Sequence, residues 1–294
     1  MKKDAVVLHD DGADGRSARS ARTILRNISY EIMPFRGTED AVLEHVPRDV
    51  ALTVTVTEAK GLAATIDLAT RLTAYGYRVA PHVAARMVQD QAHALDLLAQ
   101  LVEAEIERVF VIGGDAPTPA GTFHGAADFL RVLDTAGHHF ERVGIGGYPE
   151  GHATIGDDEL CTALTQKAPL ASHIITQICF DARTTLDWAR RLHQRHPNLE
   201  VVVGVPAPVS RQKLVRISAG IGLGQSARFL RKQQNVIWKL MRPGGYRPDT
   251  LLRGLTPHIA GTDLNVRGIH LFTFNELERA ETWRRARLAG LGDS

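Results

Sequence analysis

Cysteine is almost absent from this sequence, and so are long apolar runs. Cys161 and Cys179 are the only cysteines among 294 residues, which excludes a disulfide framework and a cysteine-rich zinc site. No apolar run approaches the roughly 20 residues that span a bilayer. The opening MKKDAVVLHDDGADG lacks the apolar centre of a signal peptide and carries too many acids for a transit sequence. We therefore expect a cytoplasmic protein without a membrane partner.

An excess of charge of one sign is missing too. Lysine and arginine number 35 against 33 acidic residues, and the net charge of +2 gives no electrostatic reason to expect a nucleic acid partner. Hydrophobic residues make up 44% of the chain, which is ordinary for a globular protein with a sizeable core. We expect residues 1–27 to form an arm with a short helix, and residues 28–294 to form one catalytic domain.

Several common catalytic motifs are also missing. The glycine-rich runs at 144–151 and 220–224 do not have the spacing of a dinucleotide fingerprint, and there is no Walker-type lysine or GxSxG elbow. Thirteen histidines are present, but no carboxylate or cysteine lies at ligand spacing beside the pair His193 and His196. The sequence therefore predicts no metal site and no covalent nucleophile.

Eight stretches of the chain are apolar or alternate between apolar and polar residues, as is typical of β-strands. Most of them are separated by segments in which apolar residues recur at helical spacing. The predicted strands are 28–35, 51–57, 78–82, 108–113, 143–147, 173–179, 200–205 and 268–274. Strands that alternate with helices favour parallel pairing, and eight of them favour an α/β fold, the (β/α)8 TIM barrel. An open doubly wound sheet is the alternative, because periodicity does not report closure.

The spacing of apolar residues predicts the helices and their buried faces. The expected faces are Leu62, Ile66, Ala69 and Leu72; Leu95, Leu98 and Val102; and Leu186, Ala189 and Leu192. Further helices are expected at 16–27, 126–133 and 158–167. The connection between strands seven and eight is longer, and extra helices are expected there with faces at Phe229, Val236 and Leu240 and at Leu252, Leu255 and Ile259.

In such a barrel the functional residues lie at the carboxyl ends of the strands. The stretch GIGGYPEGH, residues 144–152, is the clearest case, because a strand of small residues stops in a turn and leaves Tyr148, Glu150 and His152 suited to a polar ligand. The same rule places five more side chains at this end of the barrel: Glu31, Thr57, His82, Asp115 and Gln177.

Two of these acids each allow two interpretations. Alternation points Glu31 into the barrel, where desolvation would raise its pKa and suit it to act as a general acid; the alternative is a structural carboxyl paired with a lysine or arginine. Asp115 follows Gly113 and Gly114, which let the backbone approach a ligand closely. The alternative for Asp115 is a helix amino-terminal cap.

Several blocks resemble the methylenetetrahydrofolate reductase family. They are GYPEGH followed by Lys167, then IITQICFD at 174–181, and HLFTFNELE near the carboxyl end, and the resemblance runs from Ser29 to about Glu278. It implies a flavoprotein (β/α)8 barrel that interconverts 5,10-methylenetetrahydrofolate and 5-methyltetrahydrofolate. In that family hydride passes from NAD(P)H through FAD.

The resemblance also implies roles for single residues. Glu31 matches the proton donor to the folate, Asp115 an aspartate near both flavin and pterin, and Gln177 the folate-binding glutamine. The expected contacts to FAD are Thr57, His82, Gly114, Asp115, Tyr148, His152, Asp158 and Lys167.

Three positions depart from the family pattern. Gly113 and Glu276 stand where the family has arginines that contact FAD and folate, and Leu214 stands where it has a polar folate contact. Two alternatives therefore stay open: direct hydride transfer from NADH without a flavin, and a non-catalytic barrel that binds tetrahydropterin or flavin. The expected partner in each case is a small molecule, and the resemblance does not decide between a monomer and a homo-oligomer.

Overall fold

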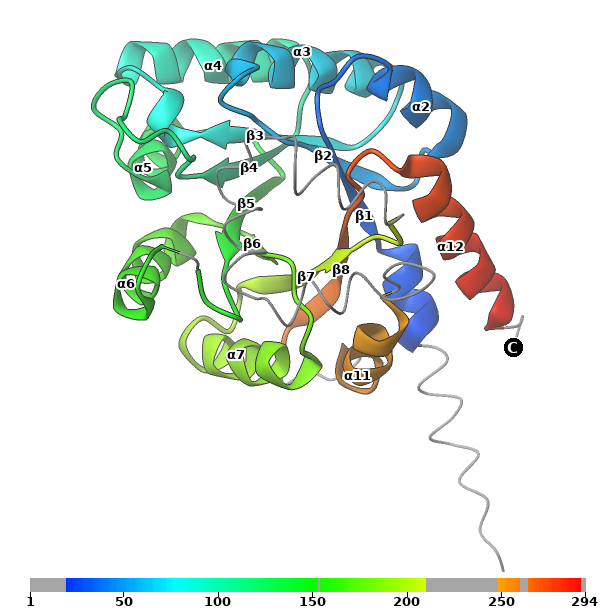
Figure 1. Ribbon diagram of the computed structural model, residues 1–294. Coiled ribbons are helices and arrows are strands. Elements are labelled where there is room, and N and C mark those ends of the chain that lie inside the picture. Colours follow the sequence, from blue (N-terminus) through cyan, green and yellow to red (C-terminus); the bar gives the residue numbers. More distant parts are fainter. Residues whose placement is uncertain (1–19, 153, 210–247, 260–263, 292–294) are drawn as a thin grey trace, which may run out of the picture.

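The computed structural model describes residues 20–152, 154–209, 248–259 and 264–291. Eight parallel strands close into a barrel in the order β1 to β8, and helices surround it (Figure 1). The prediction of a (β/α)8 TIM barrel is confirmed, and the open sheet is excluded. Across the described ranges, no helix has the length and apolarity that crossing a membrane requires.

All eight predicted strands are present. They are β1 (Ser29–Ile32), β2 (Ala51–Val54), β3 (Val79–Ala84), β4 (Arg108–Ile112), β5 (Arg142–Gly147), β6 (His173–Thr176), β7 (Glu200–Pro206) and β8 (Val266–Phe272). β1, β2 and β6 end three residues before the predicted ends, because their last apolar residues belong to the loops at the carboxyl end of the barrel. In β1 the cause is Pro34, which has no N–H to donate to a ladder.

The helices follow the strands in the expected alternation. They are α2 (Thr38–His45), α3 (Gly61–Ala74), η1 (Ala85–Met87), α4 (Gln91–Glu103), α5 (Ala126–Ala136), α6 (Asp157–Lys167), η2 (Ala168–Leu170), α7 (Ala182–Arg195), α11 (Asp249–Ile259) and α12 (Leu277–Gly290). The sequence analysis missed α2, a short helix in which only Thr38 and Val42 are buried.

The predicted buried faces of α3 and α7 are confirmed, but the prediction for α4 is wrong in part. Leu95 and Val102 are 42% and 57% exposed, and the buried stripe runs instead through Ala94, Leu97, Leu98 and Leu101. That stripe has the spacing i, i+3, i+4, i+7 of an amphipathic helix, and the two exposed residues lie beside it.

Between β7 and β8 the structure shows α11, in which Leu252 and Leu255 are buried as predicted. The face predicted at 229–240 and the side chain of Ile259 lie outside the described residues. Residues 20–26 are helical, and Ile24 and Leu25 join the main hydrophobic core. The predicted domain boundary at residue 27 stays a prediction.

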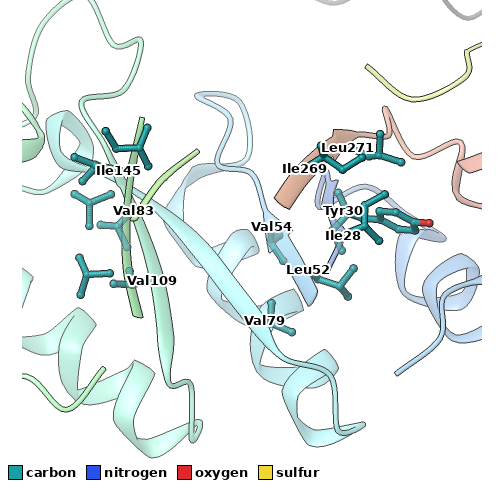
Figure 2. Packing of buried hydrophobic residues seen from close by; sticks show 14 of the residues in the cluster. Ile28, Tyr30, Leu52, Val54, Val79, Val83, Val109, Ile145, Ile269 and Leu271 are labelled. Carbon is teal, nitrogen blue, oxygen red and sulfur yellow. The ribbon is translucent and has the colours of Figure 1, made fainter. Parts of the chain in front are cut away.

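The hydrophobic core lies between the strands and the surrounding helices. Figure 2 shows Tyr30, Leu52 and Leu271 among the side chains that fill this layer. The Tyr30 hydroxyl donates a hydrogen bond of 2.8 Å to Glu281 of α12. Because side chains alternate along a strand, Ser29 and Glu31 of β1 point the other way, into the barrel.

The interior of the barrel is unusually rich in imidazole. The Nδ1 atom of His270 lies 2.7 Å from the Ser29 hydroxyl, and the ring of His82 lies 4.7 Å from that of Phe110. Desolvation lowers the pKa of His82, His173 and His270 to about 3, with smaller contributions from Arg142 and Arg108 for His173 and from the other two imidazoles for His270. The interior histidines are therefore neutral at physiological pH.

Candidate active site

Glu31 lies one residue before the end of β1, in register with Thr53 of β2 and Phe272 of β8. Its side chain is half-buried, and among the described residues no hydrogen bond or ion pair engages its carboxyl. Desolvation raises the pKa of Glu31 to about 8. A carboxyl in this state is protonated at neutral pH and has a proton to donate.

The loop after β4 brings Gly114 and Asp115 to the same end of the barrel. Gly114 has φ 91°, and a Cβ atom there would lie 2.9 Å from the Cβ of Ala84, so this turn requires glycine. The Nε atom of Arg86 donates to the carbonyl of Ala116 at 2.8 Å and ties the loop to η1, which directly follows β3. α5 begins only at Ala126, with Gly125 at its N-cap, so Asp115 is not the cap of that helix.

Tyr148 and Lys167 approach this loop from β5 and α6. Burial raises the pKa of Tyr148, and the charge of Asp115 adds to the effect, which places the two side chains near each other. The Nζ atom of Lys167 donates to the carbonyl of Gly146 at 3.3 Å, and desolvation lowers its pKa to about 8. A Cβ atom on Gly146 would lie 3.6 Å from the Tyr148 hydroxyl, so these groups surround one small-residue strand end.

The polar side chains of the turn after β5 make two different kinds of contact: Glu150 binds backbone groups of another loop, and His152 packs against Tyr148. One carboxylate oxygen of Glu150 accepts hydrogen bonds from the backbone N–H groups of Phe180 and Asp181, at 2.6 and 2.8 Å. Glu150 therefore has a structural contact that its predicted ligand-facing position did not suggest. His152 packs edge-on against Tyr148 at 5.1 Å, and its Nδ1 accepts from the backbone N–H of Ile155.

The other predicted residues lie in different surroundings. The Thr57 hydroxyl and the Nε2 atom of His82 are buried without a hydrogen-bond partner in the part of the chain described here. Gln177 follows β6, and its Oε1 accepts from the backbone N–H of Ile178. Asp158 is exposed on α6. Leu214 lies outside the described residues.

Two residues of the site escaped the sequence analysis. The Thr273 hydroxyl donates to the backbone carbonyl of Glu31, and the Asn275 side chain pairs with the backbone of Met33. The available signal was the block HLFTFNELE, which contains both residues. No group of three His, Cys, Asp or Glu side chains within the described ranges has metal-binding geometry.

The sequence profile described as methylenetetrahydrofolate reductase matches residues 19–222, which is more than half of the chain. The chain belongs to the methylenetetrahydrofolate reductase family. Among solved structures, a Clostridium thermocellum protein that binds two copies of 5-methyl-5,6,7,8-tetrahydrofolic acid is similar, with a TM-score of 0.61 and 10% identity over 90% of this chain and 98% of that chain. That similarity shows a shared fold.

A chain of the tryptophan synthase complex from Pyrococcus furiosus also matches this reductase-family chain. The match has a TM-score of 0.47 and 12% identity, and it covers 90% of this chain and 97% of that chain.

Proposed function

We propose that this protein is an NAD(P)H-dependent methylenetetrahydrofolate reductase, a cytoplasmic oxidoreductase in which Glu31 donates a proton to the folate. The observation that carries the proposal is the Glu31 carboxyl, which is half-buried, has no partner among the described residues and has a pKa raised to about 8. Family membership supports the substrate class. The folate-binding Clostridium thermocellum barrel of the same fold supports it as well.

The reaction needs one proton and one hydride. Protonation of the ring nitrogen by Glu31 opens the five-membered ring of 5,10-methylenetetrahydrofolate and leaves an iminium carbon. A hydride adds to that carbon to give 5-methyltetrahydrofolate, and Glu31 regains its proton from solvent. In the reverse direction the unprotonated Glu31 accepts the proton. A buried acid near its pKa at neutral pH serves both directions.

Other residues at this mouth of the barrel would bind and orient the folate. Gln177, directly after β6, would hydrogen-bond the pterin through its side-chain NH2 group, which has no hydrogen bond to the described residues. Asp115, at the end of β4, lies close to Tyr148 and would face the same ring. Glu31 lies on β1, and Asp115 and Gln177 follow β4 and β6, so all three come at the carboxyl end of the barrel, where the folate would bind.

The residues present fit FAD as the hydride carrier. The orphaned polar atoms of Thr57 and His82 are buried and lack a partner among the described residues, as expected of groups that a ligand would satisfy. Bound FAD would supply hydride transfer between NAD(P)H and the folate. The residues that would hold it are Thr57, His82, Gly114, Asp115, Tyr148, His152, Asp158 and Lys167.

One specific observation favours an alternative. Gly113 stands where the family has an arginine beside the flavin, so one cationic contact is missing. This favours direct hydride transfer from NADH to the folate, with Glu31 still acting as the proton donor. The non-catalytic barrel is a weaker alternative, because a binding protein has no need of a buried acid without a partner among the described residues.

The visible spectrum of the purified protein, with a folate assay, separates these functions. A flavin spectrum with NAD(P)H-dependent formation of 5-methyltetrahydrofolate supports the proposal. A colourless protein that is active with NADH supports direct transfer, and one that binds folate without turnover supports the non-catalytic barrel. A colourless protein that neither binds nor converts folates would contradict all three.

A further inference from the structure

The loop after β8 closes on the part of β1 that carries Glu31. Thr273 is fully buried; its hydroxyl donates to the carbonyl of Glu31 and accepts from the backbone N–H of Asn275 at 3.2 Å. The Asn275 side chain then engages both backbone groups of Met33. Its Oδ1 accepts from the N–H at 2.8 Å, and its Nδ2 donates to the carbonyl at 3.1 Å.

This clasp, formed by Thr273 and Asn275, has an uncommon backbone. Phe274 and Asn275 have φ values of 50° and 60°, in the left-handed region that non-glycine residues rarely adopt. Such conformations persist where the surroundings over-determine them, and they gather at functional sites. The Nδ2 atom of Asn275 also donates to the Thr38 hydroxyl at 2.8 Å, so the clasp reaches the start of α2 as well.

The clasp fixes the carboxyl end of β1 together with the Thr38 hydroxyl, which donates to the Met33 carbonyl at 2.9 Å. β1 has four residues, and beyond the hydrogen bond of 2.8 Å from the Thr55 N–H to the Ile32 carbonyl the ladder stops. The register partners of Glu31 on the neighbouring strands are Thr53 and Phe272, and both are uncharged. The direction of its carboxyl and its separation from water therefore depend on where the backbone from Glu31 to Met33 is held.

We propose that Thr273 and Asn275 are positioning residues that hold Glu31 where it can donate its proton to the substrate. The proposal rests on the function proposed for Glu31. Neither side chain is expected to touch the reacting atoms. The Thr273 hydroxyl is engaged with backbone groups of Glu31 and Asn275, and the Asn275 amide with the Met33 backbone and the Thr38 hydroxyl.

The test compares Thr273→Val and Asn275→Ala with Thr273→Ser, which keeps the hydroxyl. Tyr30→Phe is the matched control, because it removes a buried hydrogen bond on the opposite face of the same strand. Infrared difference spectra follow the carboxylic acid band of Glu31 against pH, and the band is assigned by its absence in Glu31→Gln. Steady-state kcat and KM for the folate and thermal midpoints are measured alongside.

Thr273→Val and Asn275→Ala are expected to lower the pKa of Glu31 by about one unit or more, because water reaches the carboxyl. Their kcat should fall between about tenfold and about a hundredfold, as for a reacting group displaced by roughly 1 Å. Thr273→Ser should behave like the parent, and Tyr30→Phe should lose thermal stability with an unchanged titration.

Unchanged titration and kcat in Thr273→Val and Asn275→Ala, or the same loss in Thr273→Ser as in Thr273→Val, would overturn the proposal. If Thr273→Val does not fold, the comparison of Asn275→Ala with Tyr30→Phe decides. Full folate turnover in Glu31→Gln would instead overturn the function proposed for Glu31, and the infrared titration would still report whether the clasp positions its carboxyl.

Discussion

The Oε1 atom of Glu150 lies 2.6 Å from the backbone nitrogen of Phe180 and accepts its hydrogen bond. The same oxygen accepts from the next backbone N–H, that of Asp181, which is the N-cap residue of α7. One carboxylate therefore ties the turn after β5 to the loop after β6. That loop begins with Gln177, so the contact links the predicted flavin side of the mouth to the predicted folate side.

Replacing Glu150 should loosen this connection. Glu150→Ala leaves two backbone N–H groups without their charged acceptor, and we expect the free energy of unfolding to fall by about 2 kcal/mol. Glu150→Gln retains an acceptor oxygen and should lose less. Urea denaturation measures both variants. Equal stability of Glu150→Ala and the parent would show that water replaces the carboxylate without cost.

Because the histidines inside the barrel are buried, we expect the free energy of unfolding to fall in acid. The pKa of both His82 and His270 is lowered from 6.5 to about 3 in the folded protein, so below about pH 6.5 the unfolded chain binds protons that the folded chain does not. Between pH 6.5 and 5 the free energy of unfolding should therefore fall by about 2 kcal/mol for each of these two residues. His173 should act in the same direction.

Denaturation curves from pH 8 to pH 5 check this dependence. His270→Gln keeps a polar group near Ser29 and should show a shallower fall in stability with acid than the parent. An identical pH dependence in this variant would mean that His270 does not stay neutral in the folded protein.

Substitution by alanine should affect stability differently at the adjacent glycines Gly113 and Gly114. Gly114→Ala should cost about 1 kcal/mol or more, because the left-handed backbone and the close Ala84 both disfavour a side chain. A Cβ atom on Gly113 would meet no other atom within 4 Å, so Gly113→Ala should be tolerated. Thermal unfolding of the two variants compares them directly, and equal loss in both would contradict the assignment of the turn to Gly114.

Gly113→Arg restores the cation that the family carries at this position. If the chain binds FAD, this variant should bind it about tenfold more tightly, because a charged hydrogen bond is added. Fluorescence titration with FAD measures the change, with Gly113→Ala as the control. An unchanged affinity would show that other residues already satisfy the diphosphate.

The sequence predicted the strands and the barrel because apolar alternation and helical spacing are local properties of the chain. The α4 face shows the limit of this reasoning: Leu95 and Ala94 both suit a helix, and only packing against the barrel decided which was buried. The inward direction expected of Glu31 came from alternation in the same way. Its pKa depends on its surroundings in the folded barrel, which no spacing along the chain reports.

The contacts made by Glu150 and Asn275 could not be predicted for a related reason. Each joins loops from different strands, and the partners are backbone groups, which leave no mark in the sequence. Glu150 was expected to face a ligand because it follows a strand. It does lie after β5, but its contacts with the backbone of Phe180 and Asp181 were not predicted. The resemblance to the family indicated candidate site residues, but it did not indicate which hydrogen bonds fix their positions.

The most direct test of the proposed function is a comparison of both half-reactions in Glu31→Gln. If Glu31 donates the proton to the folate and FAD carries the hydride, the variant should lose folate turnover by a factor of about 100 or more, while NAD(P)H should still reduce bound FAD at the parental rate. Equal loss of both half-reactions, or folate turnover at the parental rate, would contradict the role assigned to Glu31.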